Sequence, residues 1–479
     1  MNRDIWNTVV CLLAMAVPCS PATFSAGATK SKVRHTIIAS TGDTAPVGGN
    51  YTPFSFLNAT MNSRHAVAFD AVVGGPPFTT AVFVQDEKRT STIALGVNPD
   101  PAAQSFGTVL NPFITRNGEV VFDVNSGDVF RSDGKTIVPL VRVGDLLPGG
   151  GAVTSRVGAR VVNNHGAIAY GARLNGAAAT QGVFRSNGSQ TTTIARDDIA
   201  PPTGGNFTAL LSFDMNDLGQ VVFNSEMTAG SADHGIFLGE GGHLTPVFVS
   251  NQIAPGGATF SDCNVPGINA RGQVVATCSL VNSTSRAGLF VGNGRETVAI
   301  AIDGQRAPKG GDYETANASF SRSRLNDRGD VAFQSPLTGG TFGIFRGDGK
   351  RTTTLALTGT DAPGTTGTFQ SFGELFEIGD DGRVAFVAQL TIGAGGVDSS
   401  NNRGIWIGTS DRDLQLIVRT GEVIGGDVLT DLPFDGSSAG GHALDLSENR
   451  ILWRGTFGIT RALVVSGIAG DNECAGKED

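Results

Sequence analysis

The sequence has little charge, few tryptophans and tyrosines, and few cysteines. Charged residues make up 16% of the 479 residues, and there are three tryptophans and three tyrosines. So few rings leave little material for an aromatic platform on which a sugar could stack. The five cysteines include no Cys-x-x-Cys spacing, which argues against a structural zinc site. The net charge of −9 argues against nucleic acid and anionic membrane lipid as partners.

Long apolar runs are also missing, except near the first residue. A polar start with Arg3 leads into an apolar run over roughly residues 9–17, and small residues around Ala26 and Ala28 follow. This is the pattern of a secretory signal peptide, and the run is too short to span a bilayer. We expect cleavage after Ala28, which makes residues 1–28 the signal peptide and the mature protein secreted, periplasmic or cell-surface. No later run is apolar for long enough to be a transmembrane segment.

Glycine and phenylalanine, by contrast, are abundant. The chain has 67 glycines and 28 phenylalanines, and 40% of its residues are hydrophobic. A composition this apolar is not that of a disordered chain. Many glycines among β-branched and phenylalanine residues favour short strands separated by tight turns.

A repeat organises the chain: Asn, two residues, Gly, two residues, a small apolar residue and an aromatic. The clearest copies begin at Asn163, Asn216 and Asn326. Asn accepts a backbone hydrogen bond from two residues on, and Gly supplies a positive φ, so each copy predicts a hairpin of strands a and b. Eight copies occur, most often 53 residues apart, with the Gly slot at residues 65, 118, 166, 219, 272, 329, 382 and 449.

Each copy is followed by the signals of two more strands. A Gly-Ile-Phe-like segment such as residues 343–345 predicts strand c, and a Thr-rich run such as residues 352–357 predicts strand d. Four antiparallel strands per repeat are typical of β-propeller blades. The eighth copy lacks a strand d, whereas residues 33–40 form an extra one. We therefore predict an all-β, eight-bladed propeller over residues 29–467, closed by its N-terminal strand and followed by a polar tail, 468–479.

The eight copies resemble the bacterial secreted proteins named for tandem NxxGxxAF repeats. The resemblance covers essentially the whole mature chain. That family is biochemically uncharacterised, so the resemblance implies an exported repeat protein and no particular activity.

Candidate ligand residues lie in the loops that follow strand d, where an acidic residue precedes a proline. In a ring these loops converge on one face, so their carboxylates could bind a ligand, with calcium as the candidate ion. The alternative interpretation is that they cap their own loops; no calcium-loop motif is present, and we expect neither a metal nor a cofactor. The residues concerned are Asp43, Asp145, Asp198, Asp303 and Asp361.

Two further motifs bear on chemistry and cross-linking. Cys263 and Cys278 lie at equal distances from the centre of the fifth hairpin turn, so we predict a disulfide between strands a and b. Cys474 is then left over. A Gly-x-Ser-x-Gly match at residues 436–440, near Asp435 and His442, lies in a Gly/Ser-rich stretch and is interpreted as a loop, because a nucleophile elbow needs an α/β sheet.

The leading functional hypothesis is an exported, non-enzymatic binding or scaffold propeller, monomeric, with an extracellular protein or glycan as its partner. Two alternatives stay open. The first is an extracellular polysaccharide hydrolase or lyase on a propeller scaffold, and the second is a structural component of the cell surface. Acidic, His or Tyr side chains that stand outside the repeat and cluster at the channel mouth would favour an enzyme.

Overall fold

The computed structural model describes residues 33–468, apart from 76–77, 88, 99–104, 315–319, 321–322 and 435–443. The predicted signal peptide and polar tail, and the Gly-x-Ser-x-Gly match, lie outside these described residues except for residue 468. The described residues form 34 β-strands and no helix, so none of their segments is a helix that could cross a membrane. Eight antiparallel sheets have four strands each, and one hairpin stands apart.

The sheets are numbered as blades in chain order, and the strands of each blade are a, b, c and d. Blades 1 to 4 comprise β2 (Ala59–Met61), β3 (Val67–Val73), β4 (Thr79–Gln85), β5 (Thr90–Leu95); β6 (Val109–Ile114), β7 (Val120–Val124), β8 (Val129–Ser132), β9 (Ile137–Val141); β10 (Ala152–Val162), β11 (Ile168–Asn175), β12 (Gln181–Ser186), β13 (Thr191–Arg196); β14 (Asn206–Met215), β15 (Val221–Thr228), β16 (His234–Gly239) and β17 (Leu244–Val249).

Blades 5 to 8 continue the same order, with a small hairpin before the last blade. They comprise β18 (Thr259–Ile268), β19 (Val274–Val281), β20 (Ala287–Gly292), β21 (Thr297–Ile302); β22 (Ser323–Leu325), β23 (Val331–Pro336), β24 (Phe342–Gly347), β25 (Thr352–Leu357); β26 (Phe369–Ile378), β27 (Val384–Leu390), β28 (Arg403–Gly408), β29 (Gln415–Arg419); the hairpin β30 (Val423–Ile424) and β31 (Asp427–Val428); and β32 (Leu444–Ser447), β33 (Arg450–Phe457), β34 (Thr460–Gly467) and β1 (Arg34–Ser40).

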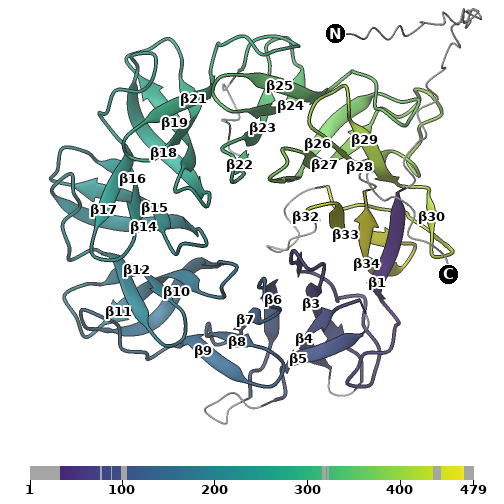
Figure 1. Cartoon of the computed structure of the whole chain (residues 1–479), viewed down its shortest axis with the longest axis horizontal. Helices are drawn as coiled ribbons and strands as arrows, with labels where there is room; N and C mark the ends of the chain where they lie inside the picture. Colours follow the sequence, from purple (N-terminus) through teal and green to yellow (C-terminus); the bar gives the residue numbers. More distant parts are fainter. Residues whose placement is uncertain are drawn as a thin grey trace, which may run out of the picture. The chain divides into compact units, whose positions relative to one another are not determined.

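The blades follow one another around a ring, which confirms the predicted eight-bladed propeller (Figure 1). Its closure is also as predicted, because β1 is strand d of blade 8. β1 pairs antiparallel with β34, from Arg34 opposite Gly467 to Ser40 opposite Ala462. The two ends of the described chain therefore share one sheet, and the ring leaves no blade open.

The repeated aromatic residues form the core of each blade. In blade 4 the rings of Phe223 and Phe237, from strands b and c, stack with centroids 5.8 Å apart, and both side chains are fully buried. They share a buried cluster with Ala169 and Val183 of the preceding blade. The small residue of the repeat thus leaves room for the aromatic ring of the next blade, which explains why the two are adjacent in the motif.

The Asn-x-x-Gly segments form the predicted a–b turns. In blade 5 the side chain of Asn269 accepts hydrogen bonds from the backbone N–H groups of Arg271 and Gln273, each at 3.0 Å, and Gly272 has a φ of +73°. This is a three-residue loop with glycine in the left-handed region. His65 takes the same conformation in blade 1, with a φ of +62°. Blade 8 differs, because Ser447 pairs directly with Arg450 across a two-residue turn.

The repeat asparagines also link one blade to the next. The side-chain amide of Asn216 donates to the backbone oxygen of Asn269, and that of Asn269 donates to the oxygen of Asn326, both at 3.0 Å. The same bond joins Asn62 to Thr115, Asn163 to Asn216 and Asn326 to Gly379. Each asparagine thus closes its own turn through its oxygen and holds the neighbouring turn through its nitrogen.

The predicted disulfide is present in blade 5. Cys263 and Cys278 are bonded and lie directly opposite each other in the sheet. The sequence predicted this pairing from an unbulged hairpin with a shorter turn. The structure differs in the turn and in strand a, and the two differences offset each other, so the two cysteines are still opposite. The turn is one residue longer than an unbulged hairpin requires, and a bulge between Asn264 and Gly267 shifts strand a back by one position.

Candidate functional site

The five predicted aspartates lie in the loops between strand d of one blade and strand a of the next. In these loops the backbone N–H of the fourth residue donates to the carbonyl of the first. Asp43 and Asp145 occupy the fourth position, and each caps its own turn: their carboxylates accept the N–H groups of Ser40 and Arg142 at 2.8 and 2.7 Å. These two side chains therefore have a structural partner within their own loop.

The other three aspartates occupy different positions of the loop. Asp198 is third and forms a two-pronged ion pair with Arg196, at 2.9 and 2.8 Å. Asp303 is second and accepts the N–H of Arg286 at 3.1 Å, and Asp361 is fifth. The five aspartates look equivalent in the sequence because each precedes a proline. In the structure they occupy different positions of the hydrogen-bonded turn. Among the described residues no group of three or more His, Cys, Asp or Glu side chains could hold a metal ion.

All three tyrosines are core residues. Tyr51, Tyr170 and Tyr313 are at most 4% exposed, and burial raises the pKa of each phenol above its usual 10.0. A phenol with a raised pKa stays protonated at neutral pH and cannot serve there as a general base.

A polar pocket of about 470 Å³ lies where blades 2, 3 and 4 meet. It opens at the ends of the blades that carry the a–b and c–d turns, which we call the turn face. The predicted aspartates belong to the opposite ends, because consecutive strands alternate in direction. The lining includes Arg131 of β8, Arg185 of β12, and residues of three turns: 163–167, 187–192 and 217–219.

The pocket walls combine side chains that already have partners with side chains that do not. Arg185 donates to the carbonyl oxygen of Gly219, and the carboxylate of Asp217 accepts two hydrogen bonds from Asn164, at 2.8 and 3.2 Å. Within the described part of the chain, the side chains of His165 and Gln190 have no hydrogen-bond partner. The pocket can therefore offer a ligand both charged and neutral polar contacts.

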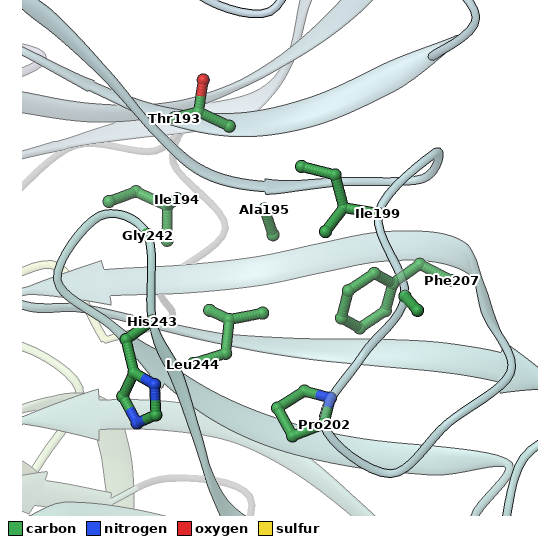
Figure 2. A pocket seen from close by; sticks show the side chains of 10 residues that line it. Thr193, Ile194, Ala195, Ile199, Pro202, Phe207, Gly242, His243 and Leu244 are labelled. Carbon is green, nitrogen blue, oxygen red and sulfur yellow. The ribbon is translucent and has the colours of Figure 1, made fainter.

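A second, apolar pocket of about 410 Å³ lies beside β13, between blades 3 and 4. Figure 2 shows the ring of Phe207 and the side chains of Pro202 and Leu244 around it, with the imidazole of His243 at one side. Its walls hold few polar groups, so it suits an apolar group and not a hydroxylated one.

The loop aspartates predicted from the sequence and the polar pocket lie at opposite ends of the blades. The signal that could have found the pocket is an arginine after the strand-c aromatic. It occurs as Val-Phe-Arg or Ile-Phe-Arg in only three blades, at Arg131, Arg185 and Arg346. Two of these arginines line the pocket.

The fold and this pocket define an eight-bladed β-propeller with a polar pocket on its turn face. The chain belongs to the DUF7453 family of unknown function, whose family model matches residues 28–233 and again residues 228–434. The first match runs from β1 to β15 and the second from β16 to β31. Each copy of the family model thus spans nearly four blades. No curated protein sequence matches the chain.

Several solved structures resemble the chain at low sequence identity. The β-propeller domain of the Trilobed protease from Pyrococcus furiosus is 10% identical, with a TM-score of 0.39, over 76% of this chain and 96% of that one. The WD40 domain of SCAP from fission yeast is 9% identical, with a TM-score of 0.41, over 91% and 98%. Polysaccharide lyase Uly1 is 11% identical, with a TM-score of 0.35, over 89% and 92%.

Proposed function

We propose that the protein is an exported, non-enzymatic propeller that binds a hydroxyl-rich extracellular ligand, a glycan, in the polar pocket of its turn face. The observation that carries this proposal is the convergence of amide, imidazole, hydroxyl and guanidinium groups around about 470 Å³. That volume falls within the range of small-molecule sites, and the lining is far more polar than such sites usually are. A ligand with many hydroxyl groups meets these donors and acceptors best.

Two observations support export. The first residues carry the charged start, apolar run and small-residue site of a signal peptide. The disulfide between Cys263 and Cys278 is of a kind that persists outside the reducing cytosol. The chain is also similar in its repeats to the exported NxxGxxAF proteins. Release of a mature protein beginning at Thr29 or close to it, read by N-terminal sequencing of the extracytoplasmic fraction, would meet this part of the proposal.

The chemistry of the pocket supports binding over catalysis. Its carboxylate, Asp217, already accepts two hydrogen bonds from Asn164, and Arg185 bonds a backbone oxygen. A hydrolase or lyase would need an acid and a base placed on either side of a scissile bond. The five loop aspartates on the opposite face remain an alternative ligand site, with calcium as the ion to test there.

The test is calorimetric titration of the mature protein with a panel of neutral and acidic oligosaccharides. We expect saturable binding with every saccharide recovered intact by mass spectrometry. Gln190→Ala, which removes one amide of the pocket, should weaken binding several-fold, whereas Asp43→Asn on the opposite face should not. Cleaved or unsaturated products would contradict the non-enzymatic assignment, and binding lost only in Asp43→Asn would move the site to the opposite face.

A further inference from the structure

The strand-c arginines of blades 2, 3 and 6 occupy equivalent positions. Arg131, Arg185 and Arg346 each follow the strand-c aromatic and pair with the small residue of strand b, which is Val121, Ala169 and Ala332 in turn. Each guanidinium lies against the turn glycine of the following blade. Arg131 and Arg185 donate to the carbonyls of Gly166 and Gly219, and a Cβ added to Gly382 would meet Arg346.

Two of these arginines are neutralised within their own blade. The residue directly after the turn glycine is Glu119 in blade 2, and its carboxylate lies 3.3 Å from Arg131. The same position in blade 6 is Asp330, whose carboxylate lies 3.1 Å from Arg346. The arginine and the acidic residue are thus one structural unit: the acid sits two positions before the strand-b residue that faces the arginine.

Blade 3 has the arginine without the acid. The residue after its turn glycine is Ala167, and within the described residues no carboxylate forms an ion pair with Arg185. The polar pocket is lined by both Ala167 and Arg185. The place that a carboxylate occupies in blades 2 and 6 is therefore open to a ligand in blade 3.

We propose that this pocket binds the carboxylate of an acidic sugar, a uronate, with Arg185 as its counter-ion. The proposal rests on the binding function proposed above and names the class of its ligand. A ligand carboxylate at Ala167 would stand in for the side chains of Glu119 and Asp330. Guanidinium and carboxylate form one of the stronger hydrogen-bonded pairs in proteins. The local positive charge of Arg185 would attract the carboxylate although the net charge of the chain is −9.

The other walls of the pocket favour a sugar over a simple anion. The Asp217 carboxylate would repel an anion that offered no hydrogen-bond donor, but it can accept a bond from a sugar hydroxyl. Gln190 adds an amide without a partner among the described residues. Leu218 is 70% exposed at the edge and suits the C–H face of a pyranose ring. A ligand that carries one carboxylate and several hydroxyl groups satisfies all three.

The experiment compares disaccharides that contain glucuronate or galacturonate with their neutral glucose and galactose counterparts, by calorimetry at low salt. Arg185→Gln removes the counter-ion, and Ala167→Glu supplies the internal carboxylate that blades 2 and 6 already contain. We expect each variant to weaken uronate binding at least tenfold. Ala167→Glu should fold normally because Glu119 shows that the position accepts this side chain. Arg346→Gln in blade 6 is the matched control and should leave the affinity unchanged.

The outcomes separate this inference from the binding function itself. If the neutral disaccharides bind as tightly as the acidic ones, or if Arg185→Gln binds uronate normally, the uronate assignment is wrong while the binding function stands. If sodium sulfate or an acidic peptide competes as well as the uronate disaccharide, the pocket takes an anion and not a sugar. If no saccharide of either kind binds the wild-type protein, both proposals fail.

Discussion

The strands of blades 5 and 8 are held together in different ways. Blade 5 is made from four consecutive strands, β18 to β21, and carries the disulfide of the described chain between residues 15 positions apart. Blade 8 takes three strands from one end of the chain and β1 from the other. One blade is held by a covalent bond that the fold does not need for closure. The other provides closure and is held by non-covalent contacts alone.

Hydrogen bonds and a ring contact hold β1 in blade 8. The imidazole of His35 on β1 and the hydroxyl of Ser466 share a hydrogen bond of 2.8 Å, across a sequence separation of 431 positions. Ser466 in turn accepts the indole N–H of Trp453 at 2.7 Å, and the rings of His35 and Trp453 meet edge to face. Thr41, after the strand, exchanges backbone and side-chain bonds with Arg461. The disulfide is therefore in blade 5, whereas the strand pairing that closes the ring is in blade 8.

The largest effect should follow from removing the closing strand. Deletion of residues 29–41 exposes the edge of β34 and opens buried residues of that strand, such as Leu463 and Val465, to water. We expect a loss of several kcal/mol and concentration-dependent association, measured by denaturant titration and light scattering. A synthetic peptide of residues 29–41, added in excess, should restore part of the stability. An unchanged melting temperature in the deleted protein would show that β1 does not close the ring.

An intermediate effect should follow from breaking the covalent bond of blade 5. Replacing both Cys263 and Cys278 by Ser should cost about 3 kcal/mol, the usual value for a loop of about 15 residues, while the propeller still closes. Thiol counting on the denatured, unreduced mature protein should find one free thiol, that of Cys474. Three free thiols would exclude the bond. A larger loss than that of the β1 deletion would reverse the comparison between the two blades.

The smallest effect should be a pH dependence at the contact of β1. Burial lowers the pKa of His35 below its usual 6.5, so the folded protein disfavours the charged imidazole. The unfolded chain then binds more protons, and stability falls as the pH drops through and below about 6.5. Protonation would also point an N–H at Ser466, which already accepts one from Trp453. His35→Gln keeps an acceptor that does not titrate.

The comparison to make is the difference between wild type and His35→Gln in urea midpoints from pH 7.5 to 5. We expect the wild type to lose stability relative to the variant as the pH falls, because only the wild type has at this position a half-buried ring that gains protons on unfolding. Parallel curves would mean that His35 titrates alike in the folded and unfolded protein. Closure of blade 8 would then be indifferent to pH over this range.

The sequence predicts the architecture well because the repeat carries it. Eight in-phase turns, four of them with both the asparagine and the glycine, locate strands a and b, and the surplus strand before Asp43 locates the closure. The details that fail are those that depend on register. The turn of blade 8 is two residues long, and the Cys263–Cys278 pairing is reached through a longer turn and a compensating bulge. Spacing alone does not reveal bulges, because they change no residue type.

The polar pocket was harder to find from the sequence for a different reason. The loop aspartates look equivalent when they are counted from the proline, but the turn hydrogen bond starts at different residues, as with Asp145 and Asp303. The carboxylate site proposed for the polar pocket rests on an absence, the lack of an acid at Ala167, which lines the same pocket as Arg185. The missing acid can be recognised only because the acid and the strand-c arginine are in contact in blades 2 and 6. These two positions are far apart in the sequence. Comparing blades within one chain supplies that test.

The pairing of β1 with β34 also constrains how the ring can form in time. A chain is made from its N-terminus, so β1 is the earliest strand of the propeller and waits for a partner that is synthesised last. Blades 1 to 7 need only neighbouring segments and can assemble as they appear, whereas blade 8 joins segments of very large sequence separation, whose contacts are slow to form. We therefore expect closure of the ring to be the final folding event. A chain interrupted before β34 would keep β1 as an unpaired, adhesive strand.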